Sequence, residues 1–541
     1  MKKLTVRILI ALIIAAMFLP ALGGCKLFGK NDERYLAQII ARVGDTTITL
    51  GDFEAAYLNE LDMQGVGYYG FDPDSPPSEY VSMIEGIKDN VFNNLIRKRV
   101  LELKAKEMEV YDRTKEDEAA GQEEYDKALD GLMENMVQKR EDNNSQIKFA
   151  KEQEIKDDWK AKAEALGEDD EPIDVDASAK EEYEKWLAET DELMTEDEIK
   201  ADAKEEYDQI LADYDENYGL EKFLEDLTQS AQERRAFEAV DASVTDDITI
   251  SADEIKAEFD KLVADQKEEY KTALPSFGLR WQFDQAKAVN KPVIEAKKQE
   301  LKAEMADATE DQIDKALEDW KMETEDLLQE DPSFVLAFTP TGYRSVKHIL
   351  VPLSDDAKAL ITEKRSEAAM AEDDDENEAL LKEADAIRDE QLLAIIENAE
   401  GIVARAKAGE DFDALIDEIG RDYYLEREPN KTLGLPLCSE STGMPEDYMK
   451  AALALEKVGD TSQPLATDEG YYIIQYTTEI NPGTSNLDDV SENIHDILLA
   501  EAKAARMEKM FEEWEADYKV KKFPRLLEKF KLNRGQYDAV G

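Results

Sequence analysis

His348, one of only two histidines in the chain, lies in the segment "SVKHILVPL", which otherwise has the apolar character of a strand. Histidine is the side chain whose proton equilibrium lies nearest neutral pH, so it could serve acid–base or hydrogen-bonding chemistry here. The structural alternative is a hydrogen-bonded histidine outside any site, which is the more frequent case for a lone histidine in a strand. The other histidine, His495, lies in a helical tail far from any motif, and we interpret it as a surface or packing residue.

A metal site is not indicated by the sequence. Asp213, Asp215 and Asn217 have the spacing of a calcium-binding loop. Tyr218, however, occupies the position that requires Gly, and Leu224 the position of the bidentate Glu, so we reject this loop. No other group of side chains has ligand spacing, and we therefore predict no metal and no organic cofactor.

The charge of the chain narrows the classes of partner. The 541 residues include 127 acidic and 66 basic side chains, which gives a formal net charge of -61. A charge of this sign excludes nucleic-acid binding that depends on attraction to phosphate. Two explanations remain open, a solvated surface on long acidic helices or a specific cationic partner. The length favours two to four domains.

The N-terminus has the pattern of a signal peptide. Basic residues up to Arg7 precede an apolar stretch over residues 8–19. The following Leu-Gly-Gly-Cys sequence, which ends at Cys25, resembles the lipobox of bacterial lipoproteins. This resemblance implies cleavage before Cys25, lipidation of its thiol and an extracytoplasmic protein anchored to the bacterial cell membrane. An uncleaved anchor helix is the alternative, but the apolar stretch is shorter than the ~20 residues that a membrane span requires.

Only Cys438 would remain besides the lipidated cysteine, so no intramolecular disulfide is expected.

Apolar periodicity predicts a mostly helical chain with a few strands. The elements that we predict are two short strands around a Gly44-Asp45 turn within residues 39–53, an amphipathic helix over 91–110, a short strand at 248–250 before a helix capped by Ser251, strands at 345–353 and 471–477, acidic helical sequence over 354–400, helices over 402–416 and 446–456, and an amphipathic tail helix over 487–530.

Three segments carry a resemblance to a known family. "VKHIL" (346–350), "AKAGEDFDALI" (406–416) and "GMPEDYMKAALALEKVGDTSQPLATDEGYYII" (443–474) resemble, in this order, the parvulin family of peptidyl-prolyl isomerases. The last segment is the most specific, because a helix, a K-x-G-D-x-S-x-P turn and a T-D-x-G-Y sequence follow one another in a single register. The resemblance implies a four-stranded antiparallel sheet flanked by helices.

The flanking segments are similar to the helical chaperone domain of PrsA-like and SurA-like foldases, and the lipobox agrees with the PrsA-like proteins. We therefore expect an α+β multidomain protein with a mostly helical chaperone domain and a parvulin-like domain. The expected segments are a signal peptide (1–24), a lipidated Cys25 with a tether (25–38), a first chaperone segment (39–110), an acidic helical insertion (111–215), a second chaperone segment with a helical extension (216–342), the parvulin-like domain (343–482) with an acidic insertion (354–400), and a C-terminal helical segment that packs on the chaperone domain (483–541).

The resemblance assigns roles to six residues. Rotation of an X-Pro bond is opposed by ~18–20 kcal/mol because the amide must lose conjugation, and catalysis requires better binding of the twisted amide than of either planar form. His348 and Asp422 match the polar groups near the twisting carbonyl, and Tyr472 stands where the family usually has a second histidine. The matches to the apolar slot for the proline ring are Met444, Tyr448 and Leu453.

Two departures from the family pattern leave the activity open. Tyr472 offers a hydroxyl in place of an imidazole, and "TLGLPL" replaces the usual aromatic wall. We expect a membrane-anchored foldase that isomerises X-Pro bonds of unfolded or partly folded exported polypeptides; a homodimer is left open. The alternative is a holdase chaperone whose parvulin-like domain is degenerate. A third hypothesis is an acidic surface lipoprotein that contacts a cationic partner. It explains the charge of the chain but not the continuous match of residues 443–474 to the parvulin pattern.

Overall fold

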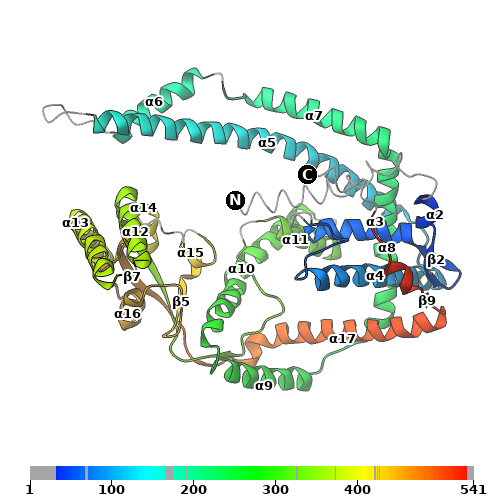
Figure 1. Ribbon diagram of the computed structural model, residues 1–541. Helices are drawn as coiled ribbons and strands as arrows, with labels where there is room; N and C mark the ends of the chain where they lie inside the picture. Colours follow the sequence, from blue (N-terminus) through cyan, green and yellow to red (C-terminus); the bar gives the residue numbers. More distant parts are fainter. Residues whose placement is uncertain are drawn as a thin grey trace. The chain divides into compact units, whose positions relative to one another are not determined.

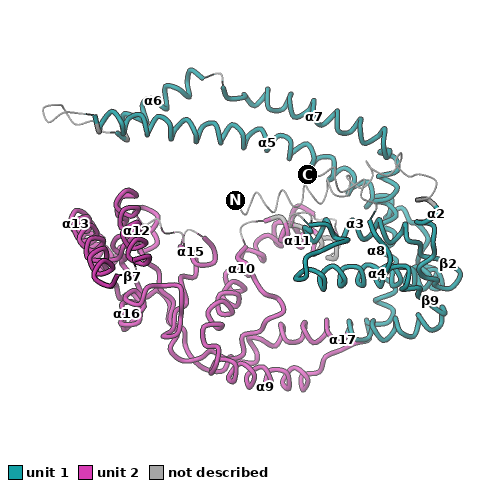
Figure 2. The backbone as a smooth tube through the Cα atoms, viewed as in Figure 1, with its two compact units in different colours: residues 1–247, 503–541 teal, residues 248–502 magenta. Residues whose placement is uncertain are grey.

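A computed structural model of the chain divides into two compact units, residues 1–247 with 503–541 and residues 248–502, which we describe separately (Figure 2). The predicted signal peptide, Cys25 and the first residues of the tether lie outside the described residues. Within the part of the chain that the structure describes, no helix is both long enough and apolar enough to cross a bilayer. The structure describes residues 32–66, 71–165, 175–190, 192–305, 308, 310–324, 327–371, 373–419, 422, 424, 425 and 427–532.

A three-stranded antiparallel sheet lies at the start of unit 1. Its strand order is β2-β1-β9, and the hairpin of β1 and β2 around Gly44-Asp45 confirms the predicted strands. Thr49 begins the next helix with a capping box, because its side chain accepts the Asp52 N–H and Asp52 accepts the Thr49 N–H. The elements are α2 (Asp32–Leu36), β1 (Ile39–Val43), β2 (Thr46–Thr49), α3 (Leu50–Met63) and β9 (Lys521–Lys522).

The tail corrects the prediction of one helix over 487–530. α17 (Leu487–Asp517) ends where Lys519 adopts a φ of 52° and the Val520 N–H donates to the Glu515 carbonyl. This hydrogen bond closes the helix as in a Schellman motif. The chain then pairs with β1 as β9 and forms the short α18 (Pro524–Leu527), because proline fits the first turn of a helix but not its interior.

The core of unit 1 joins segments that are far apart in the sequence. Helices α3, α4 (Val81–Glu107) and α8 (Leu220–Thr245) and the end of α17 bury apolar side chains against the sheet. Each such side chain contributes roughly 1.5–3 kcal/mol when it is fully buried. The most buried members include Ile40, Phe53, Ile96, Val240 and Trp514.

The region predicted as an acidic helical insertion consists of α5 (Lys115–Glu164), α6 (Val175–Glu189) and α7 (Glu196–Asn217). α6 and α7 both pack against the long α5, beside which they run in Figure 1. The N-terminal part of α5 is attached to α8 through a buried carboxylate. Asp117, which is 2% exposed, pairs with Arg235 at 2.8 Å. This ion pair fixes the position of α5, since the Asp117 carboxylate would be costly to bury without its partner.

Unit 2 begins with helices that are followed by a small two-stranded sheet. The predicted Ser251 cap is confirmed, because its side chain accepts the Glu254 N–H. The predicted strand at 248–250 is wrong: these residues are irregular, since no strand within the described residues pairs with this β-branched run. The elements are α9 (Ala252–Glu269), the 3₁₀ helix η3 (Leu274–Ser276), α10 (Phe277–Glu304), α11 (Glu310–Glu323), β3 (Phe338–Thr339) and β8 (Gly483–Thr484).

A four-stranded antiparallel sheet with the strand order β5-β4-β7-β6 forms the centre of the second half of unit 2. β4 confirms the predicted strand around His348, and β7 confirms the one at 471–477. The β4–β7 ladder places His348 opposite Ile474 and Leu350 opposite Tyr472. The strands are β4 (Arg344–Pro352), β5 (Leu435–Leu437), β6 (Leu465–Ala466) and β7 (Gly470–Glu479).

Helices cover both faces of this sheet. α13 and α14 pack on the face that carries Ile349 and Ile473, and α16 packs on the face that carries Val346 and Ile474. The helix expected to begin at residue 402 does not begin there. α13 continues through this position, because the end of an acidic composition is not a helix stop signal and a single glycine, Gly401, is tolerated within the helix. The helices are α12 (Asp355–Met370), α13 (Asp374–Lys407), α14 (Phe412–Ile419), α15 (Asn430–Leu433) and α16 (Glu446–Ala454).

Gly470 permits the close approach of β7 to β4. Its φ is +140°, and a Cβ at this position would lie 2.1 Å from the Val351 carbonyl oxygen. Only glycine avoids this clash in a backbone conformation that other residues rarely adopt. The glycine of the T-D-x-G-Y sequence therefore has a structural role in the register of the sheet.

The contact between α5 and α8 gives a first testable prediction. A Cβ on Gly121 of α5 would lie 2.4 Å from Thr228 Oγ1 and 2.6 Å from Thr228 Cα, so Gly121→Ala must push the two helices apart. We expect this variant to lose about 1–3 kcal/mol of unfolding free energy, measured by urea titration of the full chain. Gly86→Ala in α4 is the control, because nothing lies within 4 Å of its added Cβ.

Gly86→Ala should raise the unfolding free energy by about 0.5–1 kcal/mol, since alanine removes backbone freedom from the unfolded chain and favours the helix. Equal effects of the two substitutions would contradict the close helix contact at Gly121.

Candidate functional site

His348 lies in the middle of β4, on the sheet face that packs against α16. Side chains alternate between the two faces of a strand, so Val346 and His348 share this face while Lys347 and Ile349 lie on the other. On β7 the same face carries Tyr472 and Ile474. The ladder therefore brings His348 and Tyr472 together as diagonal neighbours, with ring centroids 5.0 Å apart.

Tyr448 reaches the imidazole from α16. Its hydroxyl lies 2.7 Å from His348 Nδ1, and the two rings meet edge to face at 5.4 Å. His348 is 1% exposed and Tyr448 is 0% exposed. A polar pair buried this deeply is stable only when each group finds a partner, and this hydrogen bond supplies one for both.

Asp422 approaches the opposite side of the imidazole. Its Oδ1 lies 3.2 Å from His348 Nε2, close enough for an ion pair but not aligned as a hydrogen bond. Oδ1 also accepts the Tyr424 backbone N–H at 2.7 Å, and Oδ2 accepts the Tyr472 hydroxyl at 3.3 Å. The carboxylate thus links β4, β7 and the loop that follows α14.

The four side chains have a consistent set of proton positions. Burial by itself would raise the pKa of Asp422, but the neighbouring His348, the Tyr424 N–H and the Tyr472 hydroxyl together hold that pKa below its ordinary value. An ionised carboxylate only accepts hydrogen bonds, so the ring proton of a neutral His348 belongs on Nε2. Nδ1 then accepts the hydrogen bond that the Tyr448 hydroxyl donates.

Both tyrosines keep their protons at neutral pH. Burial raises the pKa of Tyr448 well above its ordinary value, and the neighbouring Tyr472 and the charge of Asp422 add to this. Burial likewise raises the pKa of Tyr472, with Asp422 as the next cause. Both hydroxyls therefore remain hydrogen-bond donors and supply no negative charge to the site.

The structure brings all six predicted site residues to one region. His348, Asp422, Tyr448 and Tyr472 form the polar network, and Met444 and Leu453 pack half-buried around the same apolar cluster. Tyr448 differs from its predicted place in a substrate slot, because its side chain is fully buried and meets the imidazole. Met444 and Leu453 are the predicted slot residues with exposed surface.

Arg344 is a positioning residue that the sequence analysis did not identify. Its guanidinium donates to the carbonyls of Ala452 and Leu455 at the end of α16 and lies 4.9 Å from the Tyr476 ring centroid. A cation at a helix C-terminus satisfies carbonyls that have no partner within the helix. Arg344 thereby holds α16, and with it Tyr448, against β4. Its place on the same strand as His348 is the only signal that the sequence offers.

The described side chains around His348 do not form a metal-binding cluster. Among the residues that the structure describes, no group of three or more His, Cys, Asp or Glu side chains is arranged to hold a metal ion. The network has one imidazole, one carboxylate and two phenols, all engaged with one another. Such a set can orient and polarise a neighbouring group, and it contains no activated nucleophile.

Sequence comparison places the chain among known proteins. Residues 1–116 match the model of the SurA-like N-terminal domain. The chain is 32% identical over 136 residues to the "Foldase protein PrsA" of Clostridium botulinum (strain Langeland); the match spans 25% of this chain and 40% of that protein. The chain thus covers well under two thirds of the length of this curated relative.

Two solved structures align with parts of this chain at low sequence identity and low structural similarity. One is a SurA-like chaperone of Campylobacter jejuni, 17% identical, with 68% of this chain and 98% of that chain covered and a TM-score of 0.20. The other is the peptidylprolyl isomerase PrsA of Bacillus cereus, 17% identical, with 59% and 91% covered and a TM-score of 0.16. TM-scores this low do not establish a shared fold. The sequence matches show that the chain has a SurA-like N-terminal domain and is related to PrsA foldases.

Proposed function

We propose that this protein is an extracytoplasmic foldase, anchored to the membrane through Cys25, that catalyses cis–trans isomerisation of X-Pro bonds in exported polypeptides. The observation that carries the proposal is the network of His348, Asp422, Tyr448 and Tyr472, which four separate segments assemble on one face of a four-stranded antiparallel sheet. The relation to PrsA foldases supports the same class of function.

The reaction requires no covalent step. Twisting the X-Pro amide breaks its conjugation and shifts charge between the carbonyl oxygen and the nitrogen, at a cost of ~18–20 kcal/mol without a catalyst. Met444 and Leu453 offer half-buried apolar surface for the proline ring. Asp422 and Tyr472 are the more accessible members of the network, and they present a fixed carboxylate charge and a fixed hydroxyl dipole to the twisting amide, which favour the transition state over either planar form.

Within the network the least accessible residues act through the others. Tyr448 and His348 are too buried to touch a bound chain in this conformation, so they orient Asp422. We infer that His348 is a positioning residue whose loss would leave the Asp422 carboxylate with one partner fewer. Clients are expected to be unfolded or partly folded exported chains, which expose both X-Pro bonds and apolar side chains.

The alternative is a holdase chaperone without turnover. Two observations favour it: a hydroxyl replaces the second imidazole at Tyr472, and its hydrogen bond to Asp422 is long, at 3.3 Å. In that case the network would serve only to stabilise the sheet domain. Catalysis on a proline peptide separates the two functions directly.

The first test measures isomerisation of a short X-Pro peptide by exchange NMR with the full chain. His348→Ala should lower kcat/KM by about 10–100-fold, which corresponds to the loss of two polar contacts. His495→Ala is the matched control, because His495 lies on α17 outside the sheet domain and its ring pairs with its neighbour Asp496. Absence of catalysis in a folded wild-type chain would leave the holdase function as the better account.

The second test examines Tyr472, the departure from the family pattern. Tyr472→Phe keeps the ring and removes the hydroxyl that donates to Asp422, so kcat/KM should fall by up to about tenfold. Tyr471→Phe is the control on the same strand, since its side chain packs on the opposite face with α13 and α14. An equal response to both substitutions would exclude a specific role of the Tyr472 hydroxyl.

The third test uses the lowered pKa of Asp422. A carboxyl whose folded-state pKa lies below its ordinary value of 3.8 stabilises the fold above that pH, and the contribution disappears as the pH falls through the folded-state pKa. The unfolding free energy of wild type should therefore exceed that of Asp422→Asn by a constant amount above about pH 5. The difference should shrink below pH ~4. A difference that stays constant down to pH ~3 would contradict the contacts of this carboxylate.

A further inference from the structure

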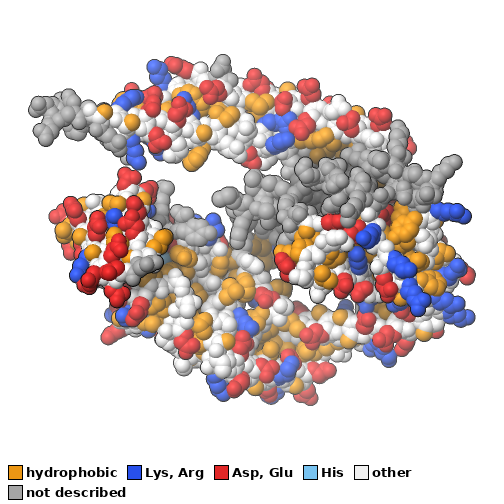
Figure 3. All heavy atoms as spheres, in the orientation of Figure 1, with side chains coloured by type: hydrophobic (Ala, Val, Ile, Leu, Met, Phe, Trp, Pro, Cys, Tyr) orange, Lys and Arg blue, Asp and Glu red, His pale blue; other side chains and the backbone are white. Residues whose placement is uncertain are grey.

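A group of cations lies in unit 1 of this acidic chain, remote in sequence from the sheet domain. Between residues 518 and 532 the tail has six Lys and Arg residues and a single acidic residue, Glu528. Arg42 of β1 pairs with Lys521 of β9 and so adds a cation from the other end of the chain. We call Arg42, Lys521, Lys522 and Arg525 the basic cluster; Figure 3 shows Lys and Arg side chains gathered over this part of unit 1.

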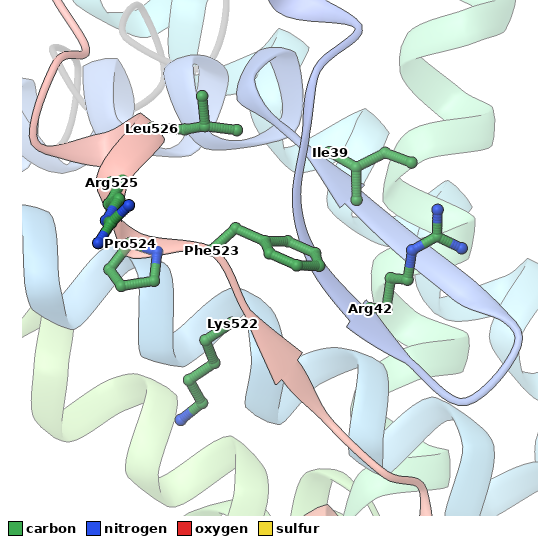
Figure 4. A pocket seen from close by; sticks show the side chains of 7 residues that line it. All are labelled: Ile39, Arg42, Lys522, Phe523, Pro524, Arg525 and Leu526. Atoms are coloured by element: carbon green, nitrogen blue, oxygen red, sulfur yellow. The ribbon is translucent and has the colours of Figure 1, made fainter.

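The basic cluster borders a cavity. Residues 522–526 of the tail, with Ile39 and Arg42 of β1, line a space of about 610 Å³. Figure 4 shows the Phe523 ring directed toward Ile39 and Arg42, with Arg525 and Lys522 to either side of it along the tail. Phe523 is 38% exposed. An accessible aromatic ring is not by itself a sign of a binding surface, but here it lies between Lys522 and Arg525 at the rim of the cavity, so apolar and cationic groups are presented together.

Backbone pairing fixes this face in place. Arg42 and Lys521 are cross-strand partners, and the Phe523 N–H donates to the Ile40 carbonyl at 2.8 Å. Lys522 forms an ion pair with Glu515 at 3.3 Å. Within the described part of the chain, Arg42, Lys521 and Arg525 have no carboxylate at ion-pair distance, although acidic residues outnumber basic ones almost two to one. Their charges are therefore available to an anionic partner.

We propose that the basic cluster docks unit 1 on the anionic headgroups of a phospholipid membrane, with the Phe523 ring entering the interface. A chain with a net charge of -61 is repelled by an anionic surface, and only a locally cationic face can approach it. Each Lys or Arg near such a surface favours contact by about fivefold, and aromatic rings settle at the headgroup level. An acidic polypeptide would supply the charge but not the continuous apolar layer that lipid chains offer to Phe523.

The sequence position of the cavity favours the membrane as the partner. Ile39, which lines it, follows Cys25 by 14 residues, a span of at most about 50 Å when fully extended. The docking therefore rests on the proposed anchoring at Cys25, which would keep the basic cluster within reach of the lipid surface. Short tethering of this kind raises the effective concentration of the second contact.

The test uses the full chain carrying Phe523→Trp and vesicles that contain brominated lipid as a quencher. We compare phosphatidylcholine alone with an equal mixture of phosphatidylcholine and phosphatidylglycerol. Quenching of the added indole, relative to the unsubstituted chain, is expected with the mixture and not with phosphatidylcholine, and high salt should abolish it. Phe149→Trp on α5, where the side chain is 65% exposed, is the control and should show no quenching.

Neutralisation tests the charge requirement. The double variant Lys521→Gln, Arg525→Gln should lower the ratio of docked to undocked chain by about 25-fold. The control variant Lys139→Gln, Lys200→Gln removes the same number of positive charges from α5 and α7, and it should leave this ratio unchanged. Equal quenching with both lipid compositions, or no response to the first pair, would overturn the proposal. Binding of polyglutamate that requires Lys521 and Arg525, without lipid quenching, would overturn it in favour of an acidic polypeptide.

Flotation of the same samples separates this proposal from the proposed function. A chain that floats with phosphatidylcholine alone is anchored, whatever the basic cluster does. If the chain floats with both vesicle compositions but its indole is not quenched, docking is refuted and the anchor is left intact. If the chain does not float with phosphatidylcholine vesicles, the anchor is refuted. Isomerase activity of the Lys521→Gln, Arg525→Gln chain is expected to equal that of wild type, since both residues lie in unit 1 and the sheet domain in unit 2.

Discussion

The pairing of β4 with β7 determines the position of every group in the candidate site. Because the ladder sets Leu350 opposite Tyr472 and His348 opposite Ile474, the imidazole and the phenol share one face of the sheet, while the aliphatic side chains between them lie on the other. A shift of one residue would move His348 to the face that packs on α13 and α14. Gly470 allows the strands to approach at the end of this ladder, and the register depends on it.

The second constraint is the cost of burying polar groups beneath α16. An imidazole, a carboxylate and a tyrosine hydroxyl that are almost inaccessible to water would destabilise the domain if any of them lacked a partner. Their mutual contacts offset most of that cost, with His348 Nε2 held by its 3.2 Å approach to Asp422 and not by an aligned hydrogen bond, and the network consequently has few alternative arrangements. This explains why a phenol can stand at position 472: its hydroxyl donates to Asp422, as an imidazole N–H could, while its ring adds edge-to-face contacts with His348 and Tyr448.

Local patterns in the sequence predict most of the helices and strands but not those that depend on distant partners. The strand around His348 follows from a run of apolar and β-branched residues, and the Ser251 cap follows from the glutamate three positions later, whereas β9 becomes a strand only by pairing with β1 at the other end of the chain. In the site, the family register identified the residues that meet around His348, since the order of strands and helices fixes which positions face one another. It did not predict that Tyr448 is fully buried, because helical spacing defines a face of α16 but not the depth to which that face is covered. The sequence did not indicate Arg344 because its partners are backbone carbonyls. Every residue has a backbone carbonyl, so residue types do not show which of them accepts a hydrogen bond.

Charge is distributed unevenly along the chain, and this has a physical consequence for both units. The acidic helices satisfy many of their carboxylates with lysines three or four positions away, such as Lys204 with Asp208 and Lys382 with Glu378, which contribute little to stability at exposed sites. The excess negative charge therefore remains and repels other anionic surfaces over about a Debye length, ~8 Å in physiological salt. Because most of the chain is repelled, unit 1 can approach an anionic surface only with the face that carries the cations of β1, β9 and α18. The orientation follows from the repulsion of the rest of the chain as much as from the attraction of the basic cluster.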